Sequence, residues 1–220
     1  MSPAGTLRAA HRGLIDLGQD TGSVNGVDWQ KEDLILMQFR NSADSYGAVA
    51  KAFHWLTVAL VILAWALGSF DDVLPKGPAR AAGLFVHISA GLTIIAALAA
   101  RLMWRLADAP PPPEPSALGA WLDRAGRLAH VALYALLIAA PVAGIVLQFA
   151  RGDALPLFGV TEIPSPWIAD RAFARSVKEV HELLANALVI LAGLHAVAAL
   201  LHHWLLKDRT LVRMLPDFKR

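Results

Sequence analysis

The sequence predicts an all-α protein, an integral membrane four-helix bundle with both termini in the cytoplasm. Of its 220 residues, 56% are hydrophobic and 17% are charged, and the mean hydropathy is +0.48. This composition is typical of membrane proteins. The chain contains eight histidines and no cysteine. The absence of cysteine excludes disulfides, cysteine-ligated iron–sulfur clusters and covalently attached haem. The net charge of +2 is too small to indicate a nucleic-acid partner, so membrane lipid is the expected surrounding.

Residues 1–36 form a polar N-terminal extension, in which no apolar stretch could span a membrane or serve as a signal peptide. Met37 is followed by a short polar lead and then by the first apolar segment. Two interpretations stay open. Either Met37 is the true start and residues 1–36 are a mis-assigned extension, or those residues form a disordered cytoplasmic tail. In both cases the membrane domain is expected at residues 37–220.

Four apolar segments are expected to span the membrane, each of about 18–26 residues and therefore long enough to cross with some tilt. They are Phe53–Phe70, Leu84–Trp104, Leu128–Phe149 and about His181–Leu206. Pro110–Pro113 and Pro115 predict a stiff connector between the second and third spans. Residues 150–180 form the longest loop, part of which is expected to fold as a short surface helix before His181.

The distribution of Lys and Arg predicts the orientation. Eleven lie on the side of the termini, namely Arg40, Lys51, Arg101, Arg105, Arg124, Arg127, Lys207, Arg209, Arg213, Lys219 and Arg220. Six lie on the opposite side, namely Lys76, Arg80, Arg151, Arg171, Arg175 and Lys178. Since basic residues favour the inner side, this excess places both termini in the cytoplasm of a bacterial inner membrane. Four of the six fall in one outward loop, an exception to the rule that suggests a function.

Histidines occur at two depths. His181 and His195 are fourteen residues apart, close to four helical turns and about 21 Å of rise, so both imidazoles lie on nearly one face. The outer layer holds only His87 and His181, whereas the cytoplasmic layer holds His54, His130, His195, His202 and His203. An imidazole in lipid needs a partner, and haem iron is one. Two stacked b-type haems are therefore expected, with His195 paired to either His54 or His130, between which depth alone does not choose.

Simpler interpretations apply to single residues. A lone histidine at the end of a span is usually an interfacial anchor or a helix cap, and zinc would require four tetrahedral ligands. Gly91, Gly144 and Gly193 interrupt three spans, where each would let a helix or a macrocycle approach closely.

Several motifs resemble a known family. They are His54-Trp55, Val86–Gly91, Ala129-His130, Ala140–Gly144, Lys178, His181-Glu182, Ala185-Asn186, Gly193–His195, His202-His203, Lys207-Asp208 and Arg213–Pro216. From about Met37 to the C-terminus, the chain is similar to the bacterial cytochrome b561 family of dihaem inner-membrane proteins. The extension of residues 1–36 departs from this family, whose members begin just before the His-Trp motif.

The resemblance implies two haem b groups, an outer one held by His87 and His181 and a cytoplasmic one held by His54 and His195. It also implies a quinone site near His130 and His202. The family includes a superoxide oxidase that passes electrons from superoxide to ubiquinone, and the cationic loop would then attract superoxide through Lys178, Arg175 and Arg171. The alternatives are an electron-relay subunit serving a partner dehydrogenase or hydrogenase, and a His-based metal or proton transporter.

Overall fold

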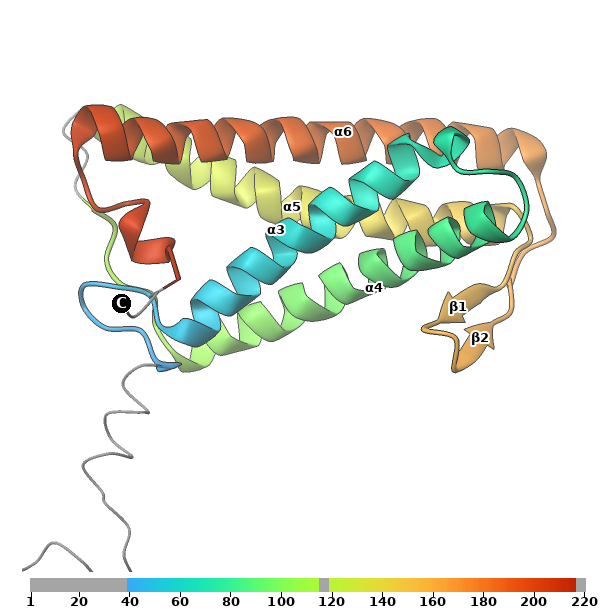
Figure 1. Ribbon diagram of the computed structural model, residues 1–220, viewed down its shortest axis with the longest axis horizontal. Helices are drawn as coiled ribbons and strands as arrows, with labels where there is room; N and C mark the ends of the chain where they lie inside the picture. Colours follow the sequence, from blue (N-terminus) through green and yellow to red (C-terminus); the bar gives the residue numbers. More distant parts are fainter. Residues whose placement is uncertain (1–38, 115–118, 217–220) are drawn as a thin grey trace, which may run out of the picture.

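The described part of the chain is built around four long helices (Figure 1). The computed structural model describes residues 39–114 and 119–216. The helices are α3 (Ala48–Ser69), α4 (Pro78–Ala107), α5 (Ala120–Ala150) and α6 (Arg171–Leu201). All four are long and apolar enough to cross a membrane, α6 together with the turn that extends it to Leu206. The predicted all-α four-span bundle is thus confirmed. The expectations for residues 1–36, Met37, Pro115, Lys219 and Arg220 concern residues outside the described part.

The start of α6 and two threonines within the spans have local hydrogen-bond partners. Asp170 caps α6, its Oδ1 accepting hydrogen bonds from the backbone N–H groups of Ala172 and Phe173, which would otherwise lack acceptors. The hydroxyl groups of Thr57 and Thr93 donate to the carbonyl oxygens four residues earlier, each at 2.7 Å. Because the bilayer core contains no water to hydrogen-bond these hydroxyl groups, the internal hydrogen bonds lower the cost of placing them in lipid.

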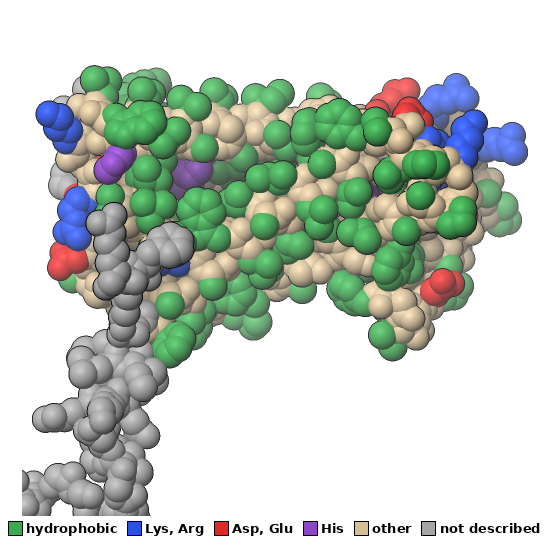
Figure 2. Space-filling model, in the orientation of Figure 1, with side chains coloured by type: hydrophobic (Ala, Val, Ile, Leu, Met, Phe, Trp, Pro, Cys, Tyr) green, Lys and Arg blue, Asp and Glu red, His purple; other side chains and the backbone are tan. Residues whose placement is uncertain are grey.

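The helices pack as two antiparallel pairs, α3 with α4 and α5 with α6. Between the pairs lies a buried core of Ile94, Leu98, Leu137 and Leu188. Large apolar side chains also cover the outside of the bundle, and charged side chains gather at its two ends (Figure 2). This is the surface of a protein whose solvent is lipid along its flanks and water at its ends.

One end, here called the hairpin end, carries the α3–α4 connection and the β-hairpin of β1 (Leu155–Leu157) and β2 (Thr161–Ile163). The strands pair antiparallel around a turn in which Phe158 and Gly159 both have positive φ. This strand pair was not predicted. The expected short surface helix before His181 was wrong, because α6 itself begins ten residues earlier, at Arg171. Arg171, Arg175 and Lys178 therefore lie on the first turns of α6 and not in a loop.

The other end, here called the terminal end, holds both ends of the described chain (Figure 1). Asp108 fastens the segment before α3, since its carboxylate accepts a hydrogen bond from the backbone of Asn41 at 2.8 Å and pairs with Arg40 at 3.4 Å. Helix α6 continues into a π-helical turn, His202–Leu206, which ends at Lys207 in the left-handed conformation. Which end faces the cytoplasm remains the prediction made from the Lys and Arg distribution.

Candidate functional site

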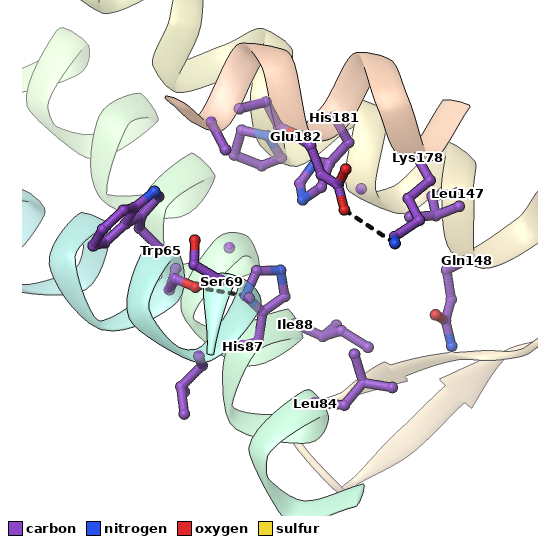
Figure 3. Close-up of a pocket in the computed structure, with 18 of the residues that line it drawn as sticks. Trp65, Ser69, Leu84, His87, Ile88, Leu147, Gln148, Lys178, His181 and Glu182 are labelled. Atoms are coloured by element: carbon purple, nitrogen blue, oxygen red, sulfur yellow. Dashed lines mark hydrogen bonds and ion pairs between the residues drawn. The ribbon is translucent and has the colours of Figure 1, made fainter. Parts of the chain in front are cut away.

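His87 of α4 and His181 of α6 face each other near the hairpin end (Figure 3). Their ring centres are 5.9 Å apart and their planes are nearly perpendicular, at 85°. Bonds from a metal to histidine nitrogen are about 2 Å long, so this separation leaves room for one metal ion between the rings. The sequence matched these histidines by depth, and the structure brings them together from two different helix pairs.

Each of these imidazoles is held in the same way by the neighbouring helix. The Nδ1 atom of His87 lies 2.8 Å from the carbonyl oxygen of Ala64 on α3. The Nδ1 atom of His181 lies 2.8 Å from the carbonyl oxygen of Ala140 on α5. A carbonyl can only accept, so both Nδ1 atoms carry the proton and both Nε2 atoms are left with a free lone pair. Histidines that bind metals usually have their other nitrogen held in this way.

A glycine one turn after each of these alanines makes room for the ring. A Cβ atom at Gly68 would lie 3.1 Å from Cε1 of His87, and one at Gly144 would lie 3.1 Å from Cε1 of His181. Both helix pairs thus carry the same element, Ala-x-x-x-Gly, which here is called the imidazole cradle. The cradles hold the His87 and His181 rings in fixed orientations. Oriented imidazoles of this kind are suited to be axial ligands of haem iron.

Sequence reasoning found only part of these cradles. Gly144 was selected as a close-approach position, and the protein group that approaches it is the His181 ring of α6. Gly68 was missed. Its signal was present in the sequence, since Ala64 and Gly68 repeat the spacing of Ala140 and Gly144. A Cβ at Gly91 would meet Pro141 at 3.9 Å, and one at Gly193 would meet nothing within 4 Å.

A cavity of about 580 Å³ lies around His87 and His181. Much of its wall is apolar, as expected for a site that takes a flat organic cofactor. Its charged lining comprises Arg80, Arg151, Lys178, Asp72 and Glu182. Three cations against two carboxylates leave a positive excess of one, and the 3.1 Å pair between Lys178 Nζ and Glu182 Oε1 offsets part of the Lys178 charge.

Arg171 and Arg175 lie outside the cavity lining but precede Lys178 by seven and three residues on α6. These spacings place the three cations along one side of the helix. Lys and Arg side chains gather visibly over this start of α6 (Figure 2). The three residues therefore form a row of cations at the start of α6, where Asp170, Glu179 and Glu182 also place carboxylates.

At the terminal end, His54 of α3, His130 of α5 and His195 of α6 form a second layer. The rings of His130 and His195 are 5.1 Å apart, at 65°. The His54 ring packs edge-on against Trp55 at 5.4 Å. Geometry places His130 against His195, whereas the family resemblance favours His54, so both remain candidates for the second ligand.

The described residues, 39–114 and 119–216, contain no group of three or more His, Cys, Asp or Glu side chains arranged to hold a metal ion directly. A tetrahedral zinc site made by the clustered histidines is therefore not formed among them. His202 follows His195 by seven residues and lies nearer the terminal end. There its Nδ1 atom hydrogen-bonds a carboxylate oxygen of Asp208 at 2.5 Å. Sequence reasoning did not find this partner of His202.

A four-span bundle with imidazoles from different helices in two layers is the architecture of a membrane cytochrome of the b type. Residues 45–217 match the prokaryotic cytochrome b561 family, and the chain belongs to this family. Membership implies haem b as cofactor and electron transfer as the general activity.

Three relatives of this chain align with it over nearly their whole length. The chain is 36% identical over 173 residues to a probable superoxide oxidase CybB of Yersinia pestis, covering 78% of this chain and 96% of the relative. It is 34% identical over 186 residues to cytochrome b561 homolog 2 of Escherichia coli (strain K12), covering 81% and 95%. It is also 27% identical over 175 residues to cytochrome b562 of Cereibacter sphaeroides, covering 77% and 94%.

Proposed function

We propose that this protein binds two haem b groups and transfers electrons from superoxide at the hairpin end to ubiquinone at the terminal end. The observation that carries the proposal is the cavity in which His87 and His181 face each other, whose lining carries three cations and two carboxylates. The similarity to a probable superoxide oxidase supports the same donor. The excess of Lys and Arg at the terminal end supports a bacterial inner-membrane orientation with that end in the cytoplasm.

The proposed axial ligands are His87 and His181 for one haem, and His54 and His195 for the other. Haem, when bound, supplies one-electron redox chemistry, and the protein supplies ligands, spacing and charge. Ala64 and Ala140 hold the tautomer in which Nε2 of His87 and of His181 is free. His130 is the alternative ligand opposite His195, and otherwise lines the proposed quinone site with His202.

Charge at the hairpin end would raise the rate at which superoxide arrives. Superoxide is a small anion, and a cleft lined by positive charge raises the local concentration of anions. Lys178, Arg175 and Arg171 supply that field from the start of α6, while Asp170, Glu179 and Glu182 oppose it. Two superoxide ions each give up one electron and leave as oxygen. Ubiquinone takes up the two electrons and two protons to become ubiquinol.

Stopped-flow spectroscopy of the purified protein, with haem quantified per chain, tests this proposal. We expect two haems per chain, rapid reduction on mixing with superoxide, and reoxidation by decylubiquinone. The double variant Lys178→Gln/Arg175→Gln should react more slowly with superoxide and depend less on salt, whereas Arg209→Gln at the terminal end should not change the rate.

Two other outcomes would each replace the proposal by a specific alternative, and a third would contradict the role of the cations. Two haems that ignore superoxide would make the protein an electron-relay subunit for a partner redox enzyme. Pure protein that binds no haem would instead support a His-based metal or proton transporter. An unchanged superoxide rate in the double variant would show that these cations do not attract the substrate.

A further inference from the structure

We propose that Asp208 is a positioning residue that orients His202 to deliver protons to ubiquinone at the terminal end. The inference rests on the proposed function for its electron acceptor, but not for its electron donor. His202 would be the group that touches the quinone, and Asp208 would act only through His202.

The contact between the two side chains fixes one tautomer of His202. Oδ2 of Asp208 lies 2.5 Å from Nδ1 of His202, and Oδ1 accepts a hydrogen bond from the backbone N–H of Thr210 at 2.9 Å. Partial burial raises the pKa of Asp208, but the hydrogen bonds from His202 and Thr210 outweigh this effect and lower it. The carboxylate is therefore ionised at neutral pH and accepts the Nδ1 proton, which leaves Nε2 as the reactive nitrogen.

The backbone brings Asp208 back to His202. The regular helix α6 ends at Leu201 and is followed by the π-helical turn His202–Leu206, a form found frequently at functional sites. Lys207 then adopts the left-handed conformation, with φ of 54°. The chain reverses there, so that the backbone N–H of Asp208 also donates to the carbonyl oxygen of His202 at 3.2 Å. Such a conformation at a residue other than glycine costs energy and points to a constraint at this site.

Residues 207–216, here called the C-terminal strap, are then fastened across the terminal end. Arg213 is buried and bonds the carbonyl oxygen of Pro112 at 2.9 Å and the carboxylate of Glu114 at 3.3 Å. The indole N–H of Trp55 on α3 donates to the carbonyl oxygen of Met214 at 2.9 Å. These two anchors hold the strap independently of the contact between His202 and Asp208.

The position of His202 suits proton delivery. It follows His195 by seven residues, two helical turns, and so lies on the same face of α6 but nearer the membrane surface. The side chains of His202 and Asp208 are 23% and 17% exposed, which leaves the pair within reach of water. For each of the two protons that the quinone takes up, His202 acts as the imidazolium protonated on both nitrogens: its Nε2–H bond breaks and an O–H bond forms on the quinone. The neutral imidazole keeps its Nδ1 proton toward Asp208 and is protonated again at Nε2 from the solvent, and the two electrons come from the reduced protein.

The test uses the full-length, haem-loaded protein, reduced with dithionite, freed of excess reductant and mixed with decylubiquinone. Superoxide plays no part in it. We expect Asp208→Asn to lower the maximal rate of haem reoxidation by about 10-fold or more, as for loss of an oriented general acid. The half-saturating quinone concentration should be unchanged and the solvent deuterium isotope effect larger. Asp208→Glu, which keeps the carboxylate, should recover most of the rate.

Matched variants separate positioning from strap stability. Glu114→Gln weakens the Arg213 anchor without touching His202, and its maximal rate should equal that of the wild type. His202→Gln should be as slow as Asp208→Asn, and the double variant no slower than either, because the two residues act as one unit. If Asp208→Asn does not retain haem, Asp208→Glu and His202→Gln decide together: Asp208→Glu should keep most of the rate, His202→Gln should lose it, and the double variant Asp208→Glu/His202→Gln should be no slower than His202→Gln.

Three results would overturn the inference: a wild-type rate in Asp208→Asn or in His202→Gln, an equal loss in Glu114→Gln, or a reduced wild-type protein that decylubiquinone does not oxidise. A failure of superoxide to reduce the haems, measured separately, would remove the proposed donor and leave this inference standing.

Discussion

Replacing Gly144 by alanine tests the imidazole cradle directly. The new Cβ would lie 3.1 Å from Cε1 and 3.5 Å from Nδ1 of His181, about 0.4 Å inside the closest favourable carbon–carbon separation of about 3.5 Å. The ring must then shift by a few tenths of an ångström, away from the position that its hydrogen bond to Ala140 requires. Overpacking of this kind costs about 1–3 kcal/mol, and a weakened hydrogen bond costs about 0.5–1.5 kcal/mol more.

This cost falls on the haem-bound state, because an imidazole without iron is free to rotate away from the methyl group. Since about 1.4 kcal/mol is a factor of ten, Gly144→Ala should weaken binding of the hairpin-end haem by about 10- to 100-fold. The haem-free protein should be as stable as the wild type or more so, because alanine favours a helix over glycine by about 1 kcal/mol. A loss of cofactor without a loss of fold is the distinguishing result.

Haem transfer to apomyoglobin measures the effect, together with haem per chain and thermal unfolding of the haem-free form. The terminal-end haem serves as an internal reference, so haem content should fall toward one per chain. Gly193→Ala is the matched control on α6, because its Cβ would meet nothing within 4 Å. If Gly144→Ala kept both haems with unchanged transfer rates, the cradle would not position the ligand and the reasoning would be refuted.

Three further predictions follow from other contacts. Glu182→Gln removes the carboxylate paired with Lys178, so the stopped-flow rate with superoxide should rise, and rise most at low salt; an unchanged rate would argue against steering. The hydrogen bonds that lower the pKa of Asp208 in the folded state stabilise the fold at pH values above the pKa of an unfolded Asp side chain. This stabilisation is lost as the pH falls through the pKa of Asp208 in the folded state. Unfolding of wild type and Asp208→Asn should therefore differ at pH 7 and converge in acid, whereas a constant difference would contradict this linkage. Finally, His54→Ala should remove the terminal-end haem while His130→Ala keeps it, as counted by haem content and absorption spectrum; the reverse result would assign His130 as the ligand.

Much of the fold could be read from hydropathy and helical period alone. Segments of spanning length predicted four helices, and the fourteen-residue spacing of His181 and His195 predicted two layers of imidazoles on one helix. The start of α6 was misplaced because residues 171–180 include four charged side chains, which lower the mean hydropathy of a segment that is nonetheless helical. The Asp170 cap, a local signal in the sequence, marks the true start.

The sequence by itself determined the class of protein, the number of spans and the depth of each histidine, because these depend on the composition and period of single segments. Only the tertiary structure decided which atoms meet across helices. The carbonyl oxygens of Ala64 and Ala140 accept from His87 and His181, Gly68 proves equivalent to Gly144, and Asp208 returns to His202. Such contacts depend on how helices rotate and slide against one another, which packing sets and the period of one helix does not.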